Sequence, residues 1–380
     1  MIMFFIVFFG LYSCFHLFAL LKLKRALNPN LAVMLAITAF MILMISAPAL
    51  VRILERHHLA TGARLLAYIG YLWMGLLFLF VSGSLLVDAY RITVWIAAKL
   101  SASELSALRL SARQGFLIPV ILSATILVYG FFDALHIRSE RLTIHTDKLP
   151  AGIDRFTIVQ ISDVHLGLIV GKHRLARILE RVEAAEPDLL VSTGDLVDGQ
   201  PNELSELAEM FRRVPVRYGK FAVTGNHEFY AGIDHSLQFT AEAGFTVLRG
   251  ESKDVAGVLT IAGVDDPAGT YGGRYRNISE KELLSGLDAR RFTLLLKHRP
   301  RMGKDADDLF DLQLSGHTHK GQVFPFSLVV ERVYPRLAGL MEVGNGQHLY
   351  VSRGSGTWGP PVRFLAPPEV TVIDLVGRTR

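Results

Sequence analysis

Hydrophobic positions are unevenly distributed along this chain, and the long apolar runs all lie in its first third. Four of these runs are long enough to cross a bilayer of roughly 30 Å at about 1.5 Å per helical residue. They cover approximately Ile2–Leu21, Leu31–Leu54, Leu65–Val87 and Phe116–Leu135. The pattern predicts a transmembrane region with four helices over residues 1–140.

The polar segments between these runs make further predictions. Residues Ser101–Gln114 begin with a capping-box pattern, Ser101 with Glu104, and are expected to form an amphipathic helix on the membrane surface. The first run has no basic residue ahead of it, which favours a retained helix over a cleaved signal peptide. His16 and Asp88 are the most nearly intramembrane polar residues, and we expect both at the membrane interface.

The orientation follows from the basic residues in the loops. If the N-terminus lies outside, seven basic residues face the cytoplasm and six face the opposite side. Lys22, Lys24 and Arg25, directly after the first run, favour this arrangement. We therefore expect a multi-pass protein of the cell (inner) membrane whose C-terminal half is extracytoplasmic, and a cytoplasmic C-terminal half remains the alternative.

From about residue 141 the pattern changes to short apolar runs separated by glycine, proline and acidic residues. The runs predict strands, with helices expected over His173–Glu186 and Asn202–Arg213. Such alternation predicts an α/β domain over residues 141–380, with stacked sheets and sites at the strand ends. The expected strands are Phe156–Ser162, Leu189–Thr193, Lys220–Thr224, Phe245–Leu248, Leu259–Val264, Phe292–Lys297, Leu312–Ser315, His348–Ser352 and Val370–Leu375.

Composition agrees with a membrane half and a soluble half. A mean hydropathy of +0.34 is too high for an ordinary soluble enzyme. Lys and Arg number 40 against 35 Asp and Glu, without a dense basic tract, so we expect contact with membrane lipids and no nucleic-acid partner. The single cysteine, Cys14, excludes an internal disulfide and a cysteine-based zinc site.

Polar side chains gather where the predicted strands end. Because alternate residues of an extended chain point the same way, D-x-H and H-x-H pairs can face one cavity. Asp, Asn and His together suit Mn, Fe or Zn ions better than Ca or Mg ions, which prefer all-oxygen ligands. The segments are Asp163-Val164-His165, Gly194-Asp195-Leu196-Val197-Asp198, Gly225-Asn226-His227-Glu228, His298, and Gly316-His317-Thr318-His319.

The order and wording of these segments resemble the calcineurin-like metallophosphoesterase superfamily, in particular a membrane-anchored bacterial branch. The resemblance implies a β-sandwich flanked by helices with a dinuclear metal centre. It implies that Asp163, His165, Asp195 and His319 hold one metal and that Asp195, Asn226, His298 and His317 hold the other. It further implies that His227 is a non-ligand residue that protonates the leaving group or stabilises the transition state.

Physical chemistry supports this implied reaction. Two metal ions about 3.5–4 Å apart can activate a hydroxide and neutralise phosphoryl oxygens, while an imidazole titrates near neutrality and can donate a proton. Asp198 and Glu228 either orient ligands or serve as turn residues. Near the C-terminus, the loop that contains Arg353, Trp358 and Arg363 either is a rigid connector or contacts phosphate or a lipid head group.

These observations predict a metal-dependent hydrolase of phosphoester or pyrophosphate bonds. A lipid-linked or envelope substrate is favoured, in phospholipid or lipid A metabolism, with manganese as a candidate metal. Hydrolysis of UDP-2,3-diacylglucosamine, which requires a cytoplasmic site, is one alternative. A non-catalytic membrane metal sensor or scaffold is another, although such proteins are expected to lose ligands that this chain retains. Transport lacks a polar intramembrane path.

Overall fold

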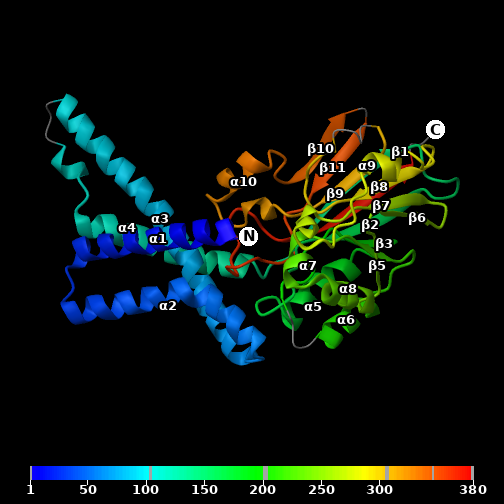
Figure 1. The fold of residues 1–380 in the computed structure, drawn as a ribbon. Coiled ribbons are helices and arrows are strands. Elements are labelled where there is room, and N and C mark those ends of the chain that lie inside the picture. The colour runs from blue at the N-terminus through cyan, green and yellow to red at the C-terminus, as the bar shows by residue number, and fades with distance from the viewer. Residues whose placement is uncertain (1, 102–104, 200–203, 304–307, 345, 378–380) are drawn as a thin grey trace. The chain divides into compact units, whose positions relative to one another are not determined.

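The computed structural model describes residues 2–101, 105–199, 204–303, 308–344 and 346–377. The chain forms two compact units, Met1–Phe132 with Gly359–Val362, and Asp133–Trp358 with Arg363–Arg380. Figure 1 shows helices alone in most of the first unit and mixed sheets and helices in the second. The domain boundary expected after residue 140 remains a prediction.

Within the described residues, four helices are long and apolar enough to cross a membrane. They are α1 (Ile2–Leu27), α2 (Leu31–Arg56), α3 (Ala60–Leu100) and α4 (Ala112–Asp133). The Asn30 side chain accepts a hydrogen bond from the backbone N–H of Val33, 3.0 Å away, and this cap begins α2. A helix is thus present at each of the four predicted spans, and α3 extends well beyond the predicted third span.

The amphipathic helix expected over Ser101–Gln114 is not formed in the described residues 105–111, and residues 102–104, which include Glu104, lie outside the described part of the chain. Instead α3 continues to Leu100, and a short 3-10 turn, η1 (Ser106–Leu108), precedes α4. A capping box is present at the start of α4 instead, and it pairs Ser111 with Gln114. The Ser111 N–H donates to Gln114 Oε1 over 2.9 Å, and the Gln114 N–H donates to Ser111 Oγ over 3.2 Å. This reciprocal cap starts α4 at Ala112.

The expected interfacial place of His16 stays a prediction, and its side chain is buried inside the first unit. Its Nδ1 donates to the carbonyl of Tyr12 over 2.8 Å, and its Nε2 accepts from Trp73 Nε1 over 2.9 Å. A carbonyl only accepts and an indole N–H only donates, so these bonds define a neutral ring with both nitrogens satisfied. Asp88 forms an ion pair with Lys22 of α1, 2.7 Å apart.

In the described part of the second unit, twelve strands form two six-stranded sheets. The first sheet has the order β1-β12-β2-β3-β4-β5, and β2 to β5 run parallel. Its strands are β1 (Arg138–Thr146), β2 (Arg155–Ile161), β3 (Leu189–Ser192), β4 (Lys220–Ala222), β5 (Phe245–Val247) and β12 (Glu369–Gly377).

The second sheet has the order β10-β11-β9-β8-β7-β6, and its four central strands, β11, β9, β8 and β7, run parallel. Its strands are β6 (Glu251–Val255), β7 (Leu259–Gly263), β8 (Phe292–Leu296), β9 (Leu312–Ser315), β10 (Gly339–Gly344) and β11 (Gln347–Val351). Every predicted strand is present, while β1, β6 and β10 were not predicted.

The two sheets pack face to face. Phe156 and Ile158 of β2 share one apolar cluster with Leu294 of β8, between the sheets. The alternate residues of β2, Val159 and Ile161, face a second cluster with the helices. This alternation follows the two-residue period of a strand, so β2 is apolar on both of its faces. One face packs against the second sheet of the sandwich and the other against the helices.

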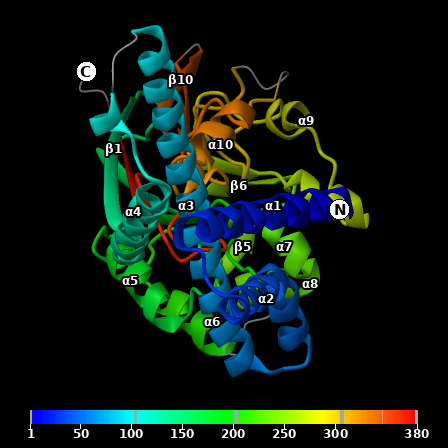
Figure 2. The ribbon, with the colours of Figure 1, turned by 90° about the vertical axis from the view of Figure 1, so that its left-hand side faces the viewer.

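Helices cover the outer faces of this sandwich. A row of α5 (Lys172–Glu183), α6 (Leu204–Arg213) and α8 (Ile233–Glu242) packs on the first sheet through residues such as Ile178, Phe211 and Phe239 (Figures 1 and 2). On the second sheet α9 (Glu280–Leu284) contributes Leu284 to a smaller cluster. The remaining described helices are α7 (Asn226–Ala231), η2 (Pro267–Gly272), η3 (His319–Gly321) and α10 (Ser327–Val333).

Candidate metal centre

The predicted site residues follow the carboxyl ends of parallel strands in both sheets. Asp163 lies two residues after β2, Asp195 three residues after β3, and His298 two residues after β8. Parallel strands bring their carboxyl ends to one edge, so loops from different strands meet there. The Gln160 side chain connects the two sheets at this edge by donating to Thr193 Oγ1 over 2.8 Å and to the Ser315 carbonyl over 3.0 Å.

The motifs converge on one buried cluster. In three overlapping groups, possible ligand atoms lie within 4.8 Å of one another. The groups are Asp163 with His165 and His319, His165 with Asp195 and His227, and Asp195 with His298 and His317. Six of the seven predicted ligands therefore meet, and Asn226 precedes His227, whose N–H donates to Asp195 Oδ1 over 2.8 Å.

Imidazole nitrogens in this cluster face one another rather than separate partners. The Nε2 atoms of His165 and His319 are 3.0 Å apart, and His317 Nδ1 is 3.1 Å from His298 Nε2. Burial lowers the pKa of His165 to about 4 and holds those of His317 and His319 well below their usual range. Neutral imidazole is the form that binds metal ions, and His165, His317 and His319 are held in that form.

Asp195 lies where the groups meet. Its Oδ2 is 3.2 Å from His298 Nε2 and 3.8 Å from His165 Nε2, one nitrogen from each of the two outer groups. Asn226 Oδ1 is buried and has no hydrogen-bond partner among the residues that the structure describes. A buried amide oxygen without a donor costs free energy unless a cation binds it, so the donor set fits divalent metal ions.

Five site residues have left-handed backbone conformations, which are uncommon for residues other than glycine. The φ angles are 51° at Asp163, 53° at His165, 52° at Asp195, 73° at His317 and 49° at His319. Each such conformation costs free energy and persists where the surrounding structure enforces it. The backbone thus turns back in the three segments that contain these residues and directs their side chains into the cluster.

Glycines make room for the turns. A Cβ added at Gly316 would overlap the side chains of Ser162 and Asp163, and one added at Gly225 would overlap the Asp195 carboxylate. The Asp163 carboxylate instead accepts the His317 N–H at 2.9 Å. Gly225 and Gly316 are therefore required by close approach to a carboxylate, whereas a Cβ at Gly194 would overlap the Gly225 backbone and the His298 ring.

Glu228 holds two site loops together. Its carboxylate accepts the N–H groups of Asp195 (3.0 Å), Leu196 (2.7 Å) and Val197 (3.2 Å) in one loop and of Gly225 (2.6 Å) in the other. Burial, with the nearby Asp195 charge, raises the pKa of Glu228 to about 7. Of the two roles left open for Glu228, the structure supports the orienting one.

His227 is paired with Asp198. The two atoms His227 Nδ1 and Asp198 Oδ1 are 2.6 Å apart, so Nδ1 donates and Nε2 is left to face another group. Burial lowers the pKa of His227, but the charges of Asp198 and Asp195 outweigh this and raise it to about 9. The sequence singled out both residues, and their pairing assigns Asp198 an orienting role.

Of the two roles predicted for the C-terminal loop, its two arginines support the rigid connector. Arg363 is fully buried and donates to backbone carbonyls, including those of Arg353 at 2.7 Å and His319 at 3.1 Å. Arg353 is paired with Glu369 and Glu140. Both arginines therefore stabilise the loop, and the expectation that they contact phosphate is wrong for Arg363, since no solvent reaches it.

A sandwich with carboxylates, imidazoles and an amide at its strand ends defines a class of protein, the metal-dependent phosphoesterases, which are hydrolases. The family model for calcineurin-like phosphoesterases matches residues 156–321, a stretch that includes every motif above. The chain belongs to the calcineurin-like phosphoesterase family, whose members use divalent metals.

Relatives agree with this assignment. An "uncharacterized metallophosphoesterase" of Aquifex aeolicus is 41% identical over 66% of this chain and 96% of its own length. A "transmembrane protein with metallophosphoesterase domain" of Danio rerio is 32% identical over 79% of this chain and 70% of its own. Among solved structures, a putative 5'-nucleotidase from Staphylococcus aureus in complex with alpha-ketoglutarate matches 53% of this chain and 49% of that chain, with 14% identity and a TM-score of 0.33. The four apolar helices also indicate membrane association.

Proposed function

We propose that this phosphoesterase hydrolyses a phosphoester or pyrophosphate bond of a lipid-linked or envelope substrate at the membrane surface. The observation that supports the location is the short connection between the two parts of the chain. Residues 134–137 alone separate the end of α4 from the start of β1. Four residues span at most about 14 Å, so the linker favours a substrate that is itself at the bilayer.

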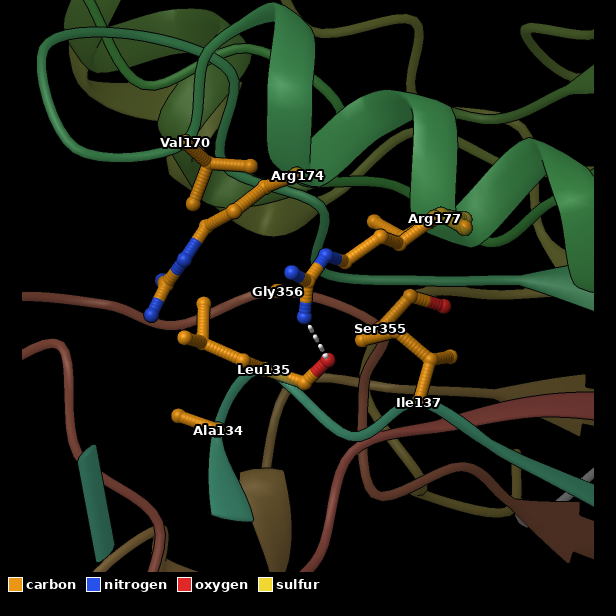
Figure 3. Close-up of a pocket in the computed structure, with 9 residues that line it drawn as sticks. Ala134, Leu135, Ile137, Val170, Arg174, Arg177, Ser355 and Gly356 are labelled. Carbon is orange, nitrogen blue, oxygen red and sulfur yellow. Dashed lines mark hydrogen bonds between the residues drawn. The ribbon is translucent and has the colours of Figure 1, made fainter. Parts of the chain in front are cut away.

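Basic residues beside this linker support an anionic substrate. Arg177 Nη1 donates to the Leu135 carbonyl over 3.1 Å, and Arg174 lies one helical turn earlier on α5 (Figure 3). Together with Ser355 and Gly356 they line a small depression in the surface. Guanidinium groups attract anionic head groups and phosphates.

We further propose the metal sets that the resemblance implies. Asp163, His165, Asp195 and His319 would hold one ion, and Asp195, Asn226, His298 and His317 would hold the other; Mn, Fe and Zn suit these donors. When bound, such ions supply an activated water and neutralise phosphoryl charge.

The protein's own groups then complete the site. His227 Nε2 donates a proton to the departing oxygen, and Asp198 holds the ring in place through Nδ1. The Glu228 carboxylate fixes the loops that present Asp195 and His227.

Hydrolysis tests the proposal directly. The full-length protein in detergent, loaded with Mn²⁺, Fe²⁺ or Zn²⁺, is expected to hydrolyse p-nitrophenyl phosphate or its bis ester, and Asp195→Asn should abolish this activity. Elemental analysis of the purified protein identifies the metals. Inactivity with every metal and both esters would instead favour a non-catalytic metal sensor or scaffold.

The membrane substrate needs a separate comparison. A phosphorylated lipid in vesicles should be hydrolysed with a higher kcat/KM than its water-soluble head group, and Arg174→Gln with Arg177→Gln should reduce that ratio. Arg213→Gln, at an exposed position on α6, is the matched control and should leave the ratio unchanged. Equal ratios in all three proteins would refute the lipid assignment.

We propose that the catalytic domain faces away from the cytoplasm in the inner membrane, on the basis of the loop charges. A C-terminal reporter that is active on one side of the membrane alone tests this orientation. A cytoplasmic signal would overturn it and would limit the substrates to those on the inner face.

A further inference from the structure

Two aromatic side chains lie beside His227, and both are partly exposed. The Tyr230 ring centroid is 5.5 Å from that of His227 with the planes at 66°, and the Trp358 centroid is 6.0 Å away at 73°. Tyr230 is 59% exposed and Trp358 is 47% exposed. Large aromatic surface that is open to solvent next to a reactive group is available to a bound molecule.

The backbone of Trp358 is held in place although its ring is exposed. Its N–H donates to Gln322 Oε1 over 2.9 Å, and its carbonyl accepts from Gln322 Nε2 over 2.8 Å. The preceding Thr357 Oγ1 accepts from Arg174 over 2.8 Å. Gln322 lies three residues after His319, so the site loop itself fixes the position of Trp358. A ring presented from a fixed backbone loses little entropy when a ligand packs on it.

The role of His227 places the leaving group against these rings. A proton donor must come within about 2.6–3.2 Å of the oxygen that it protonates. The atoms that follow that oxygen therefore lie near the rings of Tyr230 and Trp358, whereas the phosphoryl group lies toward the metal ligands. Aromatic rings favour stacked or edge-on contact with other flat rings.

We propose that Tyr230 and Trp358, the aromatic pair, form the leaving-group subsite and select a leaving group that carries a flat ring, such as a nucleobase or an aryl group. The inference rests on the proposed function of His227 as the proton donor. Tyr and Trp also serve as anchors at membrane interfaces. The aromatic pair contacts the His227 ring, and two hydrogen bonds to Gln322 hold the Trp358 backbone in place. These contacts favour a role in substrate binding over a role as a membrane anchor.

Two probes of matched chemistry test the subsite. Ethyl phosphate and 2-phenylethyl phosphate have alkoxide leaving groups of similar basicity, and the second adds a ring. With the full-length protein in detergent and Mn²⁺, the ratio of kcat/KM for 2-phenylethyl phosphate to that for ethyl phosphate should fall about tenfold in Trp358→Ala and in Tyr230→Ala. Trp358→Phe and Tyr230→Phe keep a ring and should restore most of the ratio.

The outcomes separate the possible roles. Equal losses of kcat/KM on both esters would mean that the aromatic pair positions His227, and would overturn the subsite. An unchanged ratio with weaker association of the variants with vesicles would make the pair a membrane anchor, which also overturns it. If the wild-type protein hydrolyses neither ester nor any other phosphoester, the proposed function itself fails and the inference falls with it.

Discussion

Replacing Glu228 with glutamine tests how much the site depends on a residue that is not a predicted metal ligand. The Glu228 carboxylate accepts four backbone N–H groups from the loops after β3 and β4. An amide has the same shape but presents NH₂ where one carboxylate oxygen was. Either oxygen accepts two N–H groups, so two buried donors lose their acceptor whichever way the amide turns.

The expected loss of stability follows from those two donors. A buried donor left without an acceptor costs about 1–3 kcal/mol, so Glu228→Gln should lower the free energy of unfolding by about 4 kcal/mol. For a domain of this size that corresponds to a fall of about 10 °C in the midpoint of thermal unfolding. Because the loops also orient Asp195 and His227, metal affinity should fall about 10–100-fold.

Thermal unfolding of the full-length protein in detergent, with and without Mn²⁺, measures the first effect, and calorimetric titration with Mn²⁺ measures the second. Glu183→Gln, at an exposed position on α5, makes the same chemical change outside the site and should alter stability by less than about 0.5 kcal/mol. If the Glu228 variant matches this control in both measurements, the orienting role is refuted.

Three other predictions concern single residues. His227→Asn should lower kcat about 10²–10⁴-fold on ethyl phosphate while the metal content stays that of the wild type. The loss should be smaller on p-nitrophenyl phosphate, because its leaving group needs no proton. Equal losses of kcat on the two esters would contradict proton donation. Burial lowers the pKa of His298, but the carboxylate beside it outweighs this and raises the pKa to about 10, so the metal-free protein is protonated there. A metal ion must displace that proton, and Mn²⁺ affinity from titration calorimetry should rise about tenfold per pH unit between pH 6 and 8; a flat profile would contradict this. Gly316→Ala should place a methyl group against the Asp163 carboxylate and reduce the bound metal measured by elemental analysis. Gly286→Ala is the control, because Gly286 has open space around it, and should leave the metal content unchanged. Equal metal content in the two variants would exclude the close approach at Gly316.

The central strands were predictable because they are buried on both faces and read as continuous apolar runs. The strands that sequence reasoning missed, β1, β6 and β10, lie at three of the four sheet edges. The residues of β1 and β6, Arg138–Thr146 and Glu251–Val255, are largely polar and exposed, and β10 is a short run between two glycines. An edge strand gains its structure from the neighbour that it pairs with, and that neighbour can be far away in sequence. For β1 it is β12.

Convergence of the motifs was predictable from strand ends and spacing, because one buried strand precedes each motif. How the site is held together was not. The left-handed conformations at Asp163 and Asp195, and the burial of Arg363, depend on segments that meet only in the folded domain. The sequence allowed Glu228 to be either a turn residue or an orienting residue. Its four N–H partners, which come from two loops, are visible only in the folded domain. The local sequence shows which polar side chains are available for the site. Long-range packing decides which of them contact the metal-ligating residues.

The position of β12 has a consequence for synthesis of the protein. This strand, Glu369–Gly377, lies between β1 and β2, which leave the ribosome far earlier. At about 5–20 residues per second, the ~200 residues that separate β2 from β12 take tens of seconds to translate. During that interval the growing chain has two unpaired strand edges that another polypeptide can bind. Because β12 is synthesised after every other described strand, the first sheet stays incomplete until this strand emerges.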